Sequence, residues 1–390
     1  MDHVRFGVIG LGSMGHSHTE RLFAGEVPGA VLTAVCDIKQ DRLDWAKNLC
    51  GDSVSYFLDS HELITSGLVD AVMIATPHYF HPIIGIDAFE HGLNVLSEKP
   101  IGVYTKKVLE FMDAAKKSGK AFGIMYNQRT DPHFRKMREI VQSGALGQLK
   151  RGVWIITNWY RTQSYYNSGG WRATWSGEGG GVLMNQCPHN LDLWQWIFGM
   201  PCSVYANCEF GKYHDIEVED DVTAMAKYPN GATGMFITTT GEYPGTNRFE
   251  ISGSKGRLIY DDGDLHYLKL SMDERDFTAG DRRGFASIPI ESDELLPIDG
   301  AGEQHVGILK NFTNHLLYGE ELIAPGYDGI NGLSIANAMM LSSHKKDWVD
   351  LPNDGEEYWA LLQSRIAVSR RKEDAGVVLD TAGTYGTGKK

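Results

Sequence analysis

Three glycines near the N-terminus have the spacing of a phosphate-binding turn. Gly10, Gly12 and Gly15 follow the apolar run 4–9 directly and precede a helix-like segment. In this pattern the first glycine allows a tight turn, the second lets the backbone approach a pyrophosphate, and the third lets helix and strand pack closely. The amides at the start of the helix then face the phosphates. The predicted dinucleotide contacts in this turn are Gly10, Gly12, Ser13, Met14 and Gly15.

An acidic residue indicates which dinucleotide the turn binds. Asp37 stands 22 residues after Gly15, at the end of the strand-like run 31–36. Its carboxylate can accept hydrogen bonds from both ribose hydroxyls and would repel a 2′-phosphate, which favours NAD over NADP. Lys39 and Arg42 remain within reach of a phosphate, and Arg42 counts as a predicted cofactor contact. The alternative is that the glycines only form a turn and Asp37 only caps the next helix.

Four further motifs follow the glycine turn along the chain. They are Thr76-Pro77-His78-Tyr79-Phe80-His81, Glu98-Lys99-Pro100, Asn127-Gln128-Arg129 and the glycine-rich segment 179–192. In this order the five motifs resemble the Gfo/Idh/MocA family of sugar and cyclitol oxidoreductases, over about residues 3–352. The resemblance implies a Rossmann domain followed by an open-faced sheet domain, a bound nicotinamide cofactor and a homo-oligomer, either a dimer or a tetramer. It also implies that Lys99 and a histidine aligned with His189 lie at the active site.

These two residues suit the oxidation of a secondary alcohol. The reaction delivers a hydride to the nicotinamide and a proton to a base. A histidine transfers protons near neutral pH, and a lysine polarises the oxygen as its charge changes. We expect His189 to act as base or acid and Lys99 as an orienting electrophile, with the roles open to exchange or sharing.

The segment before His189 departs from the family pattern. The family often has an aspartate four residues before the histidine, where this chain has Asn185. Asparagine can orient a hydroxyl or a nicotinamide but cannot carry a proton as a carboxylate does. Asp192 lies three residues after His189, on the same helical face, and is expected to orient the histidine. The alternative is that Asp192 stabilises the first turn of a helix.

The remaining motifs supply the other predicted cofactor contacts. Lys99 follows a strand-like run, and parallel sheets place ligands at the carboxyl ends of their strands. For His78 and His81 a core or capping role is an equal alternative. The full set is Thr76, Pro77, His78, His81, Glu98, Lys99 and Asn127.

Aromatic residues crowd the middle of the chain, with six tryptophans between positions 154 and 196. Flat aromatic faces bind the apolar face of a pyranose, but buried indoles also fill cores. The arginines of this region either fork onto a carboxylate or sugar hydroxyls, or lie on the surface. The loop that carries these aromatic residues and arginines, called the aromatic loop below, favours a glycoside or a bulky modified sugar over a small polyol as the substrate. The predicted substrate contacts are Trp159, Tyr160, Arg161, Trp171 and Arg172.

Two domains are expected to position these residues. Up to residue 126, strand-like and helix-like segments alternate as in a doubly wound parallel sheet, so residues 1–126 form the predicted NAD-binding domain. Residues 127–352 read as an α+β domain with an open-faced, mainly antiparallel sheet, in which 274–301 is a long loop or insertion. The predicted helix 329–345 is placed to pack back on the first domain. Residues 353–390 are expected to hold a terminal helix, 356–371, and a flexible tail from 381.

Composition excludes several classes of protein. The net charge is −13 and no basic cluster is visible, which argues against nucleic-acid binding. No apolar run reaches the length of a membrane span, and no signal peptide is recognisable, so a cytoplasmic location is expected. The five cysteines show no CxxC pairing, which predicts reduced thiols and no metal site.

The sequence therefore predicts an NAD-dependent oxidoreductase that acts on a ring hydroxyl or ketone of a sugar, glycoside or cyclitol. Two alternatives remain. One is an NAD-retaining enzyme that cleaves or rearranges a glycosidic or anhydro-sugar linkage by transient oxidation, elimination and re-reduction. The other is a non-catalytic NAD-binding sensor.

Overall fold

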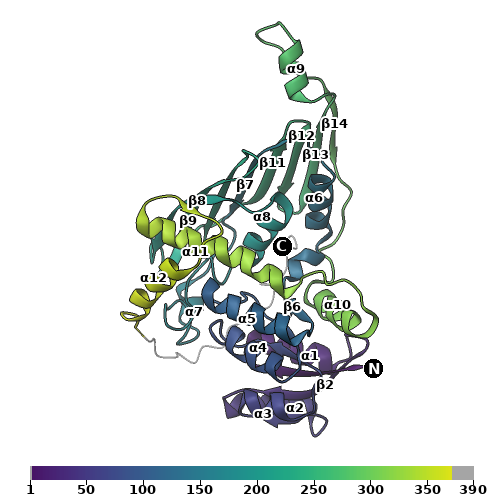
Figure 1. Ribbon diagram of the computed structural model, residues 1–390, viewed down its shortest axis with the longest axis vertical. Helices are drawn as coiled ribbons and strands as arrows, with labels where there is room; N and C mark the ends of the chain where they lie inside the picture. The colour runs from purple at the N-terminus through teal and green to yellow at the C-terminus, as the bar shows by residue number, and fades with distance from the viewer. Residues whose placement is uncertain (1, 371–390) are drawn as a thin grey trace.

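The computed structural model describes residues 2–370 and contains two sheets with helices packed between and around them (Figure 1). The predicted tail 381–390 and the last residue of the predicted terminal helix, Arg371, lie outside the described residues. No helix among residues 2–370 is long and apolar enough to cross a membrane.

The first sheet has six strands, all parallel, in the order β3-β2-β1-β4-β5-β6. The strands are β1 Val4–Ile9, β2 Ala30–Cys36, β3 Ser55–Phe57, β4 Ala71–Ile74, β5 Asn94–Ser97 and β6 Phe122–Ile124. The central strands are nearly continuous buried apolar runs, as expected where helices cover both faces. The strand order reverses between β1 and β4, which is where such sheets bind their ligands. The predicted doubly wound sheet is confirmed.

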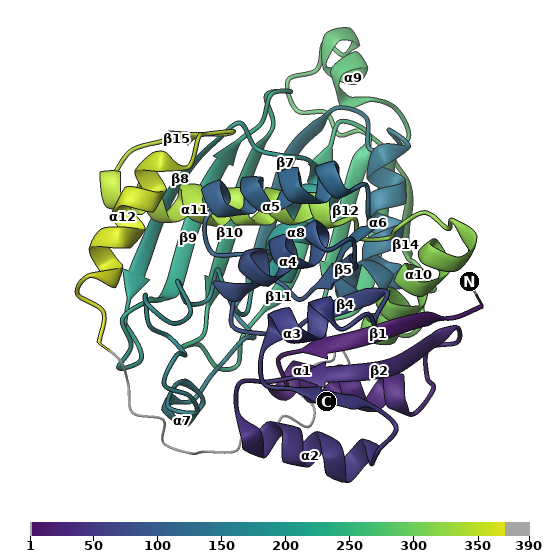
Figure 2. The ribbon, with the colours of Figure 1, turned by 60° about the horizontal axis from the view of Figure 1, so that its bottom comes forward.

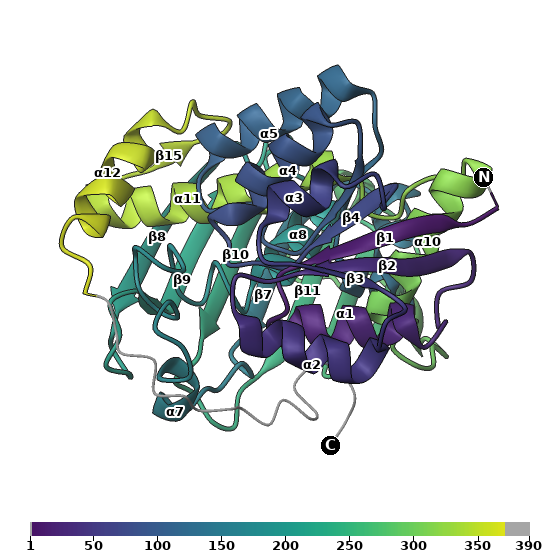
Figure 3. The ribbon, with the colours of Figure 1, turned by 90° about the horizontal axis from the view of Figure 1, so that it is seen from below.

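Helices cover both faces of this sheet (Figure 3). Helices α1 (Ser13–Phe23) and α2 (Gln40–Cys50) lie on one face, and α3 (Ser60–Thr65), α4 (Phe80–Glu90) and α5 (Thr105–Ser118) lie on the other. Helix α1 begins directly after Gly12, so the glycine turn stands at the strand-order reversal.

The second sheet has nine strands in the order β14-β13-β12-β11-β7-β10-β9-β8-β15, and only the β7–β10 pair is parallel. The strands are β7 Leu149–Ile156, β8 Ser203–Phe210, β9 Glu219–Lys227, β10 Thr233–Thr239, β11 Asn247–Gly253, β12 Gly256–Asp261, β13 Asp264–Leu270, β14 Ile290–Leu295 and β15 Val349–Asp350. Helices α6 (Pro132–Gln142), α8 (Pro188–Phe198) and α11 (Gly329–Lys345) lie over one face of it (Figure 2). Buried and exposed residues alternate along β9, as in a sheet with one open face.

Two segments differ from the sequence prediction. Residues 274–301 were expected to form a loop or insertion, but they contain α9 (Glu274–Gly280) and β14, which extend away from the first domain (Figure 1). Helix α10 (Gln304–Tyr318) was not predicted, and it returns to the first sheet, where the rings of Phe312 and Phe6 are 6.3 Å apart. The remaining elements are the 3-10 helices η1 Asn127–Thr130 and η2 Gly326–Asp328, and the helices α7 Gln163–Tyr166 and α12 Glu356–Ile366.

Helix α11 has the predicted bounds and contacts both domains. Asn337 donates to the carbonyl of Val103 at 3.1 Å and accepts from the amide of Thr105 at 3.2 Å. Because Val103 lies just before α5 and Thr105 begins it, α11 ties the nine-stranded sheet to the first domain.

Candidate active site

The glycine turn has the shape that a pyrophosphate requires. A Cβ on Gly15 would lie 1.8 Å from the Gly10 carbonyl oxygen, and one on Gly10, whose φ is +90°, would lie 2.8 Å from the backbone of Ala75. These two glycines therefore close the turn. A Cβ on Gly12 would meet nothing within 4 Å, so open space stands before the N-terminus of α1. The residues present fit a dinucleotide, because amide donors and free space coincide there.

Asp37 is held in place next to this turn. Its Oδ2 accepts from the Leu11 amide at 2.7 Å, and its Oδ1 accepts from the Lys39 amide at 2.9 Å. Arg42 donates to the Leu11 carbonyl at 3.2 Å, so it supports the same corner. Both backbone donors leave further lone pairs of the carboxylate for ribose hydroxyls.

Lys99 stands where β5 meets the second domain. Its Nζ donates to the backbone carbonyl of Asn185 at 2.8 Å, across the boundary between the domains. Burial lowers the pKa of Lys99, while the carboxylates of Glu98 and Glu178 oppose that effect. The preceding carboxylate is already occupied, since Glu98 accepts from the Lys99 amide at 3.0 Å and contacts His18 Nε2 at 2.7 Å. Burial raises the pKa of Glu98, but the hydrogen bond and charge of His18, together with the charges of His305 and Lys99, hold it at about 2.

His189 lies in the first turn of α8, directly after Pro188, which begins the helix. Its pKa is well below the ordinary value because the ring is buried and because the charges of Lys99 and His305 lie nearby. Its Nδ1 is buried and has no hydrogen-bond partner among the described residues. A neutral imidazole whose Nδ1 has no partner among the described residues, and on which the charge of Lys99 acts, can accept a proton.

Asp192 does not contact His189 in the way expected from the sequence. Both of its oxygens are taken by Arg129, whose Nε lies at 2.8 Å and whose Nη2 lies at 2.6 Å. Arg129 also donates to Asp328 at 2.6 Å, and Gln195 donates to Asp192 at 3.1 Å. Asp192 and Arg129 are each 1% exposed, so this is a buried link between α8, η1 and η2. The sequence placed Asp192 and His189 on one helical face. It could not show that Asp192 pairs with Arg129, which lies 63 residues earlier in the chain.

Two of the other predicted cofactor contacts, His78 and His81, connect the loops after β4 and β5 and the second domain. His81 lies 2.7 Å from the carbonyls of both Thr76 and Pro100, and thereby ties the loop after β4 to the loop after β5. His78 Nδ1 is 3.3 Å from the Glu178 carbonyl, so His78 faces the second domain. Two buried polar atoms here, Thr76 Oγ1 and Asn127 Oδ1, have no partner among the described residues. They are the kind of group that a bound cofactor would satisfy.

The aromatic loop divides into two parts. Arg172 packs over the rings of Trp171 and Tyr165, at 4.8 and 4.5 Å from their centroids, and donates to the Tyr165 hydroxyl at 2.8 Å. Trp159 donates to Asn190 of α8 at 3.3 Å. Tyr160 is exposed and packs against Tyr243 instead.

Arg161 uses its guanidinium on its own loop. The group donates to the Tyr160 carbonyl at 2.9 Å and lies over the rings of Trp159 and Tyr165. Trp159 thus contacts α8, Arg172 lies 3.9 Å from Glu178, and the ring of Trp171 faces His78 at 5.8 Å.

Glu178 is a site residue that was not predicted from the sequence. This residue is 1% exposed, and its carboxylate accepts hydrogen bonds from the Ala173 amide and the Asn185 side chain. Its only sequence signal was an acid directly before three glycines, Gly179 to Gly181. The role of the glycines is visible in the structure, where a Cβ on Gly181 would lie 1.9 Å from the Glu219 carbonyl.

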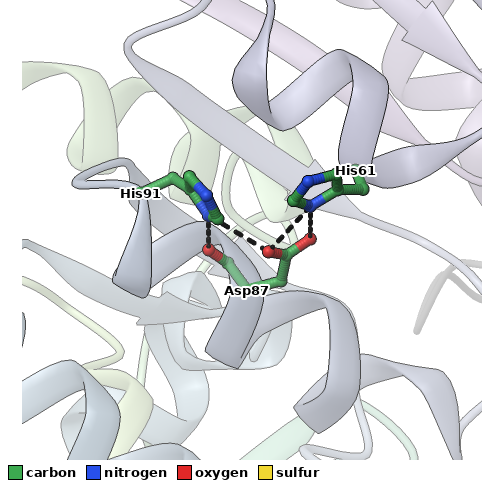
Figure 4. A group of neighbouring side chains, drawn as sticks. All are labelled: His61, Asp87 and His91. Carbon is green, nitrogen blue, oxygen red and sulfur yellow. Dashed lines mark hydrogen bonds and ion pairs between the residues drawn. The ribbon is translucent and has the colours of Figure 1, made fainter.

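A second cluster of titratable residues lies apart from Lys99 and His189, on α3 and at the C-terminal end of α4. His61 Nδ1 is 3.0 Å from Asp87 Oδ2, and His91 Nδ1 is 3.1 Å from Asp87 Oδ1 (Figure 4). The ligand atoms lie within 4.8 Å of one another, as in a metal site, which the sequence analysis did not expect. The three side chains are partly solvent-exposed and bind one another, so their contacts are explained as a link between α3 and α4.

The chain belongs to the Gfo/Idh/MocA oxidoreductase family. Residues 4–126 match the family model described as "Oxidoreductase family, NAD-binding Rossmann fold", and residues 134–259 match the "GFO/IDH/MocA C-terminal domain". The predicted resemblance is therefore confirmed in both domains, and so is an NAD-binding first domain.

Individual relatives point to sugars and cyclitols. The myo-inositol 2-dehydrogenase of Thermotoga maritima is 28% identical over 89% of this chain and 98% of its own. The WlbA dehydrogenase from Bordetella pertussis, solved with NADH and UDP-GlcNAcA, has a TM-score of 0.75 and 25% identity, over 90% of this chain and 99% of its own. A glycosyl hydrolase family 109 protein of Shewanella putrefaciens is 26% identical over 68% of this chain and 55% of its own. The chain is an NAD-binding oxidoreductase of the sugar and cyclitol dehydrogenase type.

Proposed function

We propose that this enzyme transfers a hydride between NAD and a ring hydroxyl or ketone of a sugar, glycoside or cyclitol, with Lys99 and His189 handling the hydroxyl proton. The observation that carries the proposal is that Lys99 Nζ reaches the Asn185 carbonyl, four residues before His189, whose buried Nδ1 has no partner among the described residues. Lys99 comes two residues after β5, at the edge where this sheet type holds its ligands, and His189 lies in the first turn of α8.

The hydrogen-bonding capacity of the two residues supports this division of roles. When bound, the nicotinamide accepts the hydride from the carbon that carries the hydroxyl. One N–H of the Lys99 ammonium donates to the Asn185 carbonyl, and the other two can donate to the substrate oxygen. His189 is neutral near pH 7, because burial lowers its pKa, and it can accept the hydroxyl proton. In the reverse direction, the same imidazole returns the proton to the oxygen of the ketone.

The aromatic loop supports a ring-shaped substrate. The faces of Trp159 and Trp171 and the guanidinium of Arg172 come from the segment that leads into Asn185 and α8. Aromatic faces pack on the C–H face of a sugar ring, and Arg172 offers donors to hydroxyl groups. We assign Trp159, Trp171 and Arg172 to the substrate and leave Tyr160 and Arg161 outside its contacts.

A second function is favoured by the similarity to a glycosyl hydrolase family 109 protein. In that alternative, oxidation of a ring hydroxyl to a ketone acidifies a neighbouring C–H, and elimination releases the aglycone as an alcohol. Water then adds to the unsaturated ketone, and the hydride taken up in the first step returns to the carbonyl carbon. The reaction leaves no net NADH. The same Lys99 and His189 would serve its oxidation step.

A homo-oligomer is proposed from the open face of the nine-stranded sheet. The outward residues of β9 include Met225, which is 43% exposed, beside Thr223 and Lys227. A sheet face with exposed apolar groups is a common site of subunit association.

One experiment separates the candidate functions. The purified enzyme is incubated with NAD and a panel of inositols, free sugars and glycosides, while NADH absorbance and product mass are followed together. Net NADH with a ketone product, two hydrogens lighter than the substrate, supports the dehydrogenase. Cleavage or rearrangement without net NADH supports the second function. Binding of NADH with no turnover of any compound contradicts both and supports a sensor.

A further inference from the structure

Glu178 is a buried acid at the edge of the proposed active site that the proposed chemistry does not yet use. One oxygen accepts from the Ala173 amide, and the other accepts from Nδ2 of Asn185. Arg172 Nη1 lies 3.9 Å from the Asn185-facing oxygen. The side chain is 1% exposed, so it can act on a ligand only through its neighbours.

The position of this acid is related to the missing carboxylate of the family pattern. Asn185 stands where a carboxylate would be expected four residues before His189, and its backbone carbonyl binds Lys99 at 2.8 Å. The side chain of the same residue binds Glu178. A carboxyl group is thus present at this corner, displaced by one hydrogen bond from position 185. Burial raises the pKa of Glu178, while the charges of Arg172 and Lys99 and the hydrogen bonds from Ala173 and Asn185 favour its carboxylate form.

A purely structural role explains this arrangement less well. Burying a carboxylate costs free energy, and an uncharged side chain could accept the Ala173 amide equally well. The negative charge also acts on a second residue, because Glu178 is one of the two carboxylates that counter the effect of burial on Lys99. The other one, Glu98, is occupied by His18 and the Lys99 amide.

We propose that Glu178 is a positioning residue that supplies, through Asn185, the negative charge which this active site lacks at position 185, and that it thereby stabilises the Lys99 ammonium. The inference rests on the proposed dehydrogenase function and deepens it. Glu178 holds the Asn185 side chain, and Asn185 in turn presents its carbonyl to Lys99.

The proposal predicts the direction in which the titration of Lys99 moves. Burial lowers the pKa of Lys99, and Glu178 raises it. Removal of the Glu178 charge should therefore lower the pKa of Lys99 further, whether Lys99 works as an acid or as a base. The charged and titratable groups that act on Lys99, or on which Lys99 acts, are Glu98, Glu178, Arg172, Cys187, His78, His81, His189 and His305.

A charge-relocation test separates the role of the charge from the role of the hydrogen bonds. In the double variant Glu178→Gln/Asn185→Asp, the side-chain carbonyl at position 178 can accept from the Ala173 amide, and the amino group there can donate to the new carboxylate at position 185. Every hydrogen bond of the pair is then kept while the charge moves from 178 to 185. In Glu178→Gln alone, Asn185 can turn its amide to accept from the substituted side chain, so the contact remains but the charge is lost.

The experiment measures the reactivity of Lys99 itself in the full-length enzyme without substrate. Acetic anhydride labels each variant over a range of pH, and peptide mass spectrometry gives the midpoint for Lys99, with the exposed Lys117 as internal control. In Glu178→Gln the Lys99 midpoint should fall by about one pH unit, the lower end of the shift that a nearby opposite charge typically causes. In the double variant it should return to the wild-type value. The Lys117 midpoint should stay constant throughout.

The other outcomes overturn the proposal. A Lys99 midpoint unchanged in Glu178→Gln shows that the charge does not act on Lys99. If the midpoint stays low in the double variant, the site needs Glu178 itself and not a carboxylate at this corner. If Glu178→Gln alone does not fold, the Lys99 midpoint of the double variant decides whether a carboxylate at position 185 replaces Glu178. If neither variant folds, Glu178 has a structural role and the proposal is wrong.

Turnover gives an independent second readout. With the substrate found by the NADH screen, kcat should fall about tenfold in Glu178→Gln, which corresponds to about one pKa unit, and recover in the double variant. If the wild-type enzyme oxidises no compound, the proposed function fails. The labelling result still reports on Glu178, so the two failures are distinguishable.

Discussion

Two polar residues of one helical turn have opposite surroundings. His189 and Asp192 both lie in the first turns of α8 and are both buried. Asp192 is saturated, with two bonds from Arg129 and one from Gln195. His189 has a buried Nδ1 without any partner among the described residues. The saturated residue fixes the helix in the molecule, and the unsatisfied one is left to meet a ligand.

The same contrast separates two cationic side chains, Arg129 and Lys99. Arg129 uses its donors on Asp192, Asp328 and the Ile323 carbonyl. Lys99 binds one backbone carbonyl and is lowered in pKa by its burial. A buried cation that is fully paired belongs to the framework, whereas one that is only partly paired and has a perturbed pKa marks a functional site.

The largest expected effect follows from removing the partly paired cation. Lys99→Ala should lower kcat about 10³- to 10⁴-fold, because the substrate oxygen loses its charged donor. The free energy of unfolding should change little, because the buried ammonium contributes a single hydrogen bond to a carbonyl. The matched control is Lys117→Ala, which removes an exposed lysine of α5. Steady-state kinetics with the screened substrate and thermal unfolding measure both quantities.

Full activity in Lys99→Ala would show that Lys99 is not part of the chemistry. If the loss of activity in Lys99→Ala came with a comparable loss of folding free energy, Lys99 would have a structural role like that of Arg129. The two cations would then not differ in function.

The second largest effect is a loss of folding free energy when the Arg129–Asp192 pair is broken. Arg129→Leu leaves Asp192 buried without its cation, and loss of one partner of such a pair costs about 3–5 kcal/mol of folding free energy. Urea unfolding followed by circular dichroism measures this loss. The matched control is Arg151→Leu at an exposed pair, where Arg151 and Glu250 are 3.9 Å apart, with an expected cost below about 1 kcal/mol. Equal costs for the two variants would contradict the assignment of Arg129 to the framework.

Much of the fold could be predicted because its signals are local. The buried runs of β1 and β4 read directly as parallel strands, and α11 was predicted with its observed bounds. Strand β14, Ile290–Leu295, could not be read in this way, since it has no buried face and exists only by pairing with β13 at the sheet edge. Helix α10 does carry a helical apolar pattern, so its signal was present in the sequence and was overlooked.

The site was predictable in its motifs but not in its pairings. The glycine turn, Asp37 and Lys99 are each recognisable from a short stretch of chain. The partners of Asp192 and Lys99 lie 63 and 86 residues away, so only the folded structure shows that one carboxylate is taken by Arg129 and that Lys99 meets Asn185. Glu178 was missed for the same reason, because its effect depends on Lys99 and its sequence setting is merely an acid before glycines.

The third and smallest effect tests the unsatisfied residue of α8. In the wild-type enzyme, oxidation should require neutral His189, so kcat/KM should rise with pH and level off at a pH below the ordinary pKa of histidine, because burial and Lys99 lower the pKa of His189. His189→Gln keeps a hydrogen-bonding side chain but cannot take up a proton, so kcat should fall about 10²-fold. The acidic limb of the pH profile should vanish at the same time. Gln195→Ala is the control on the same helix, because Gln195 serves the saturated Asp192, and its profile should keep the wild-type limb. A His189→Gln profile with an unchanged acidic limb would assign that limb to another group and would leave Lys99 to handle the proton alone.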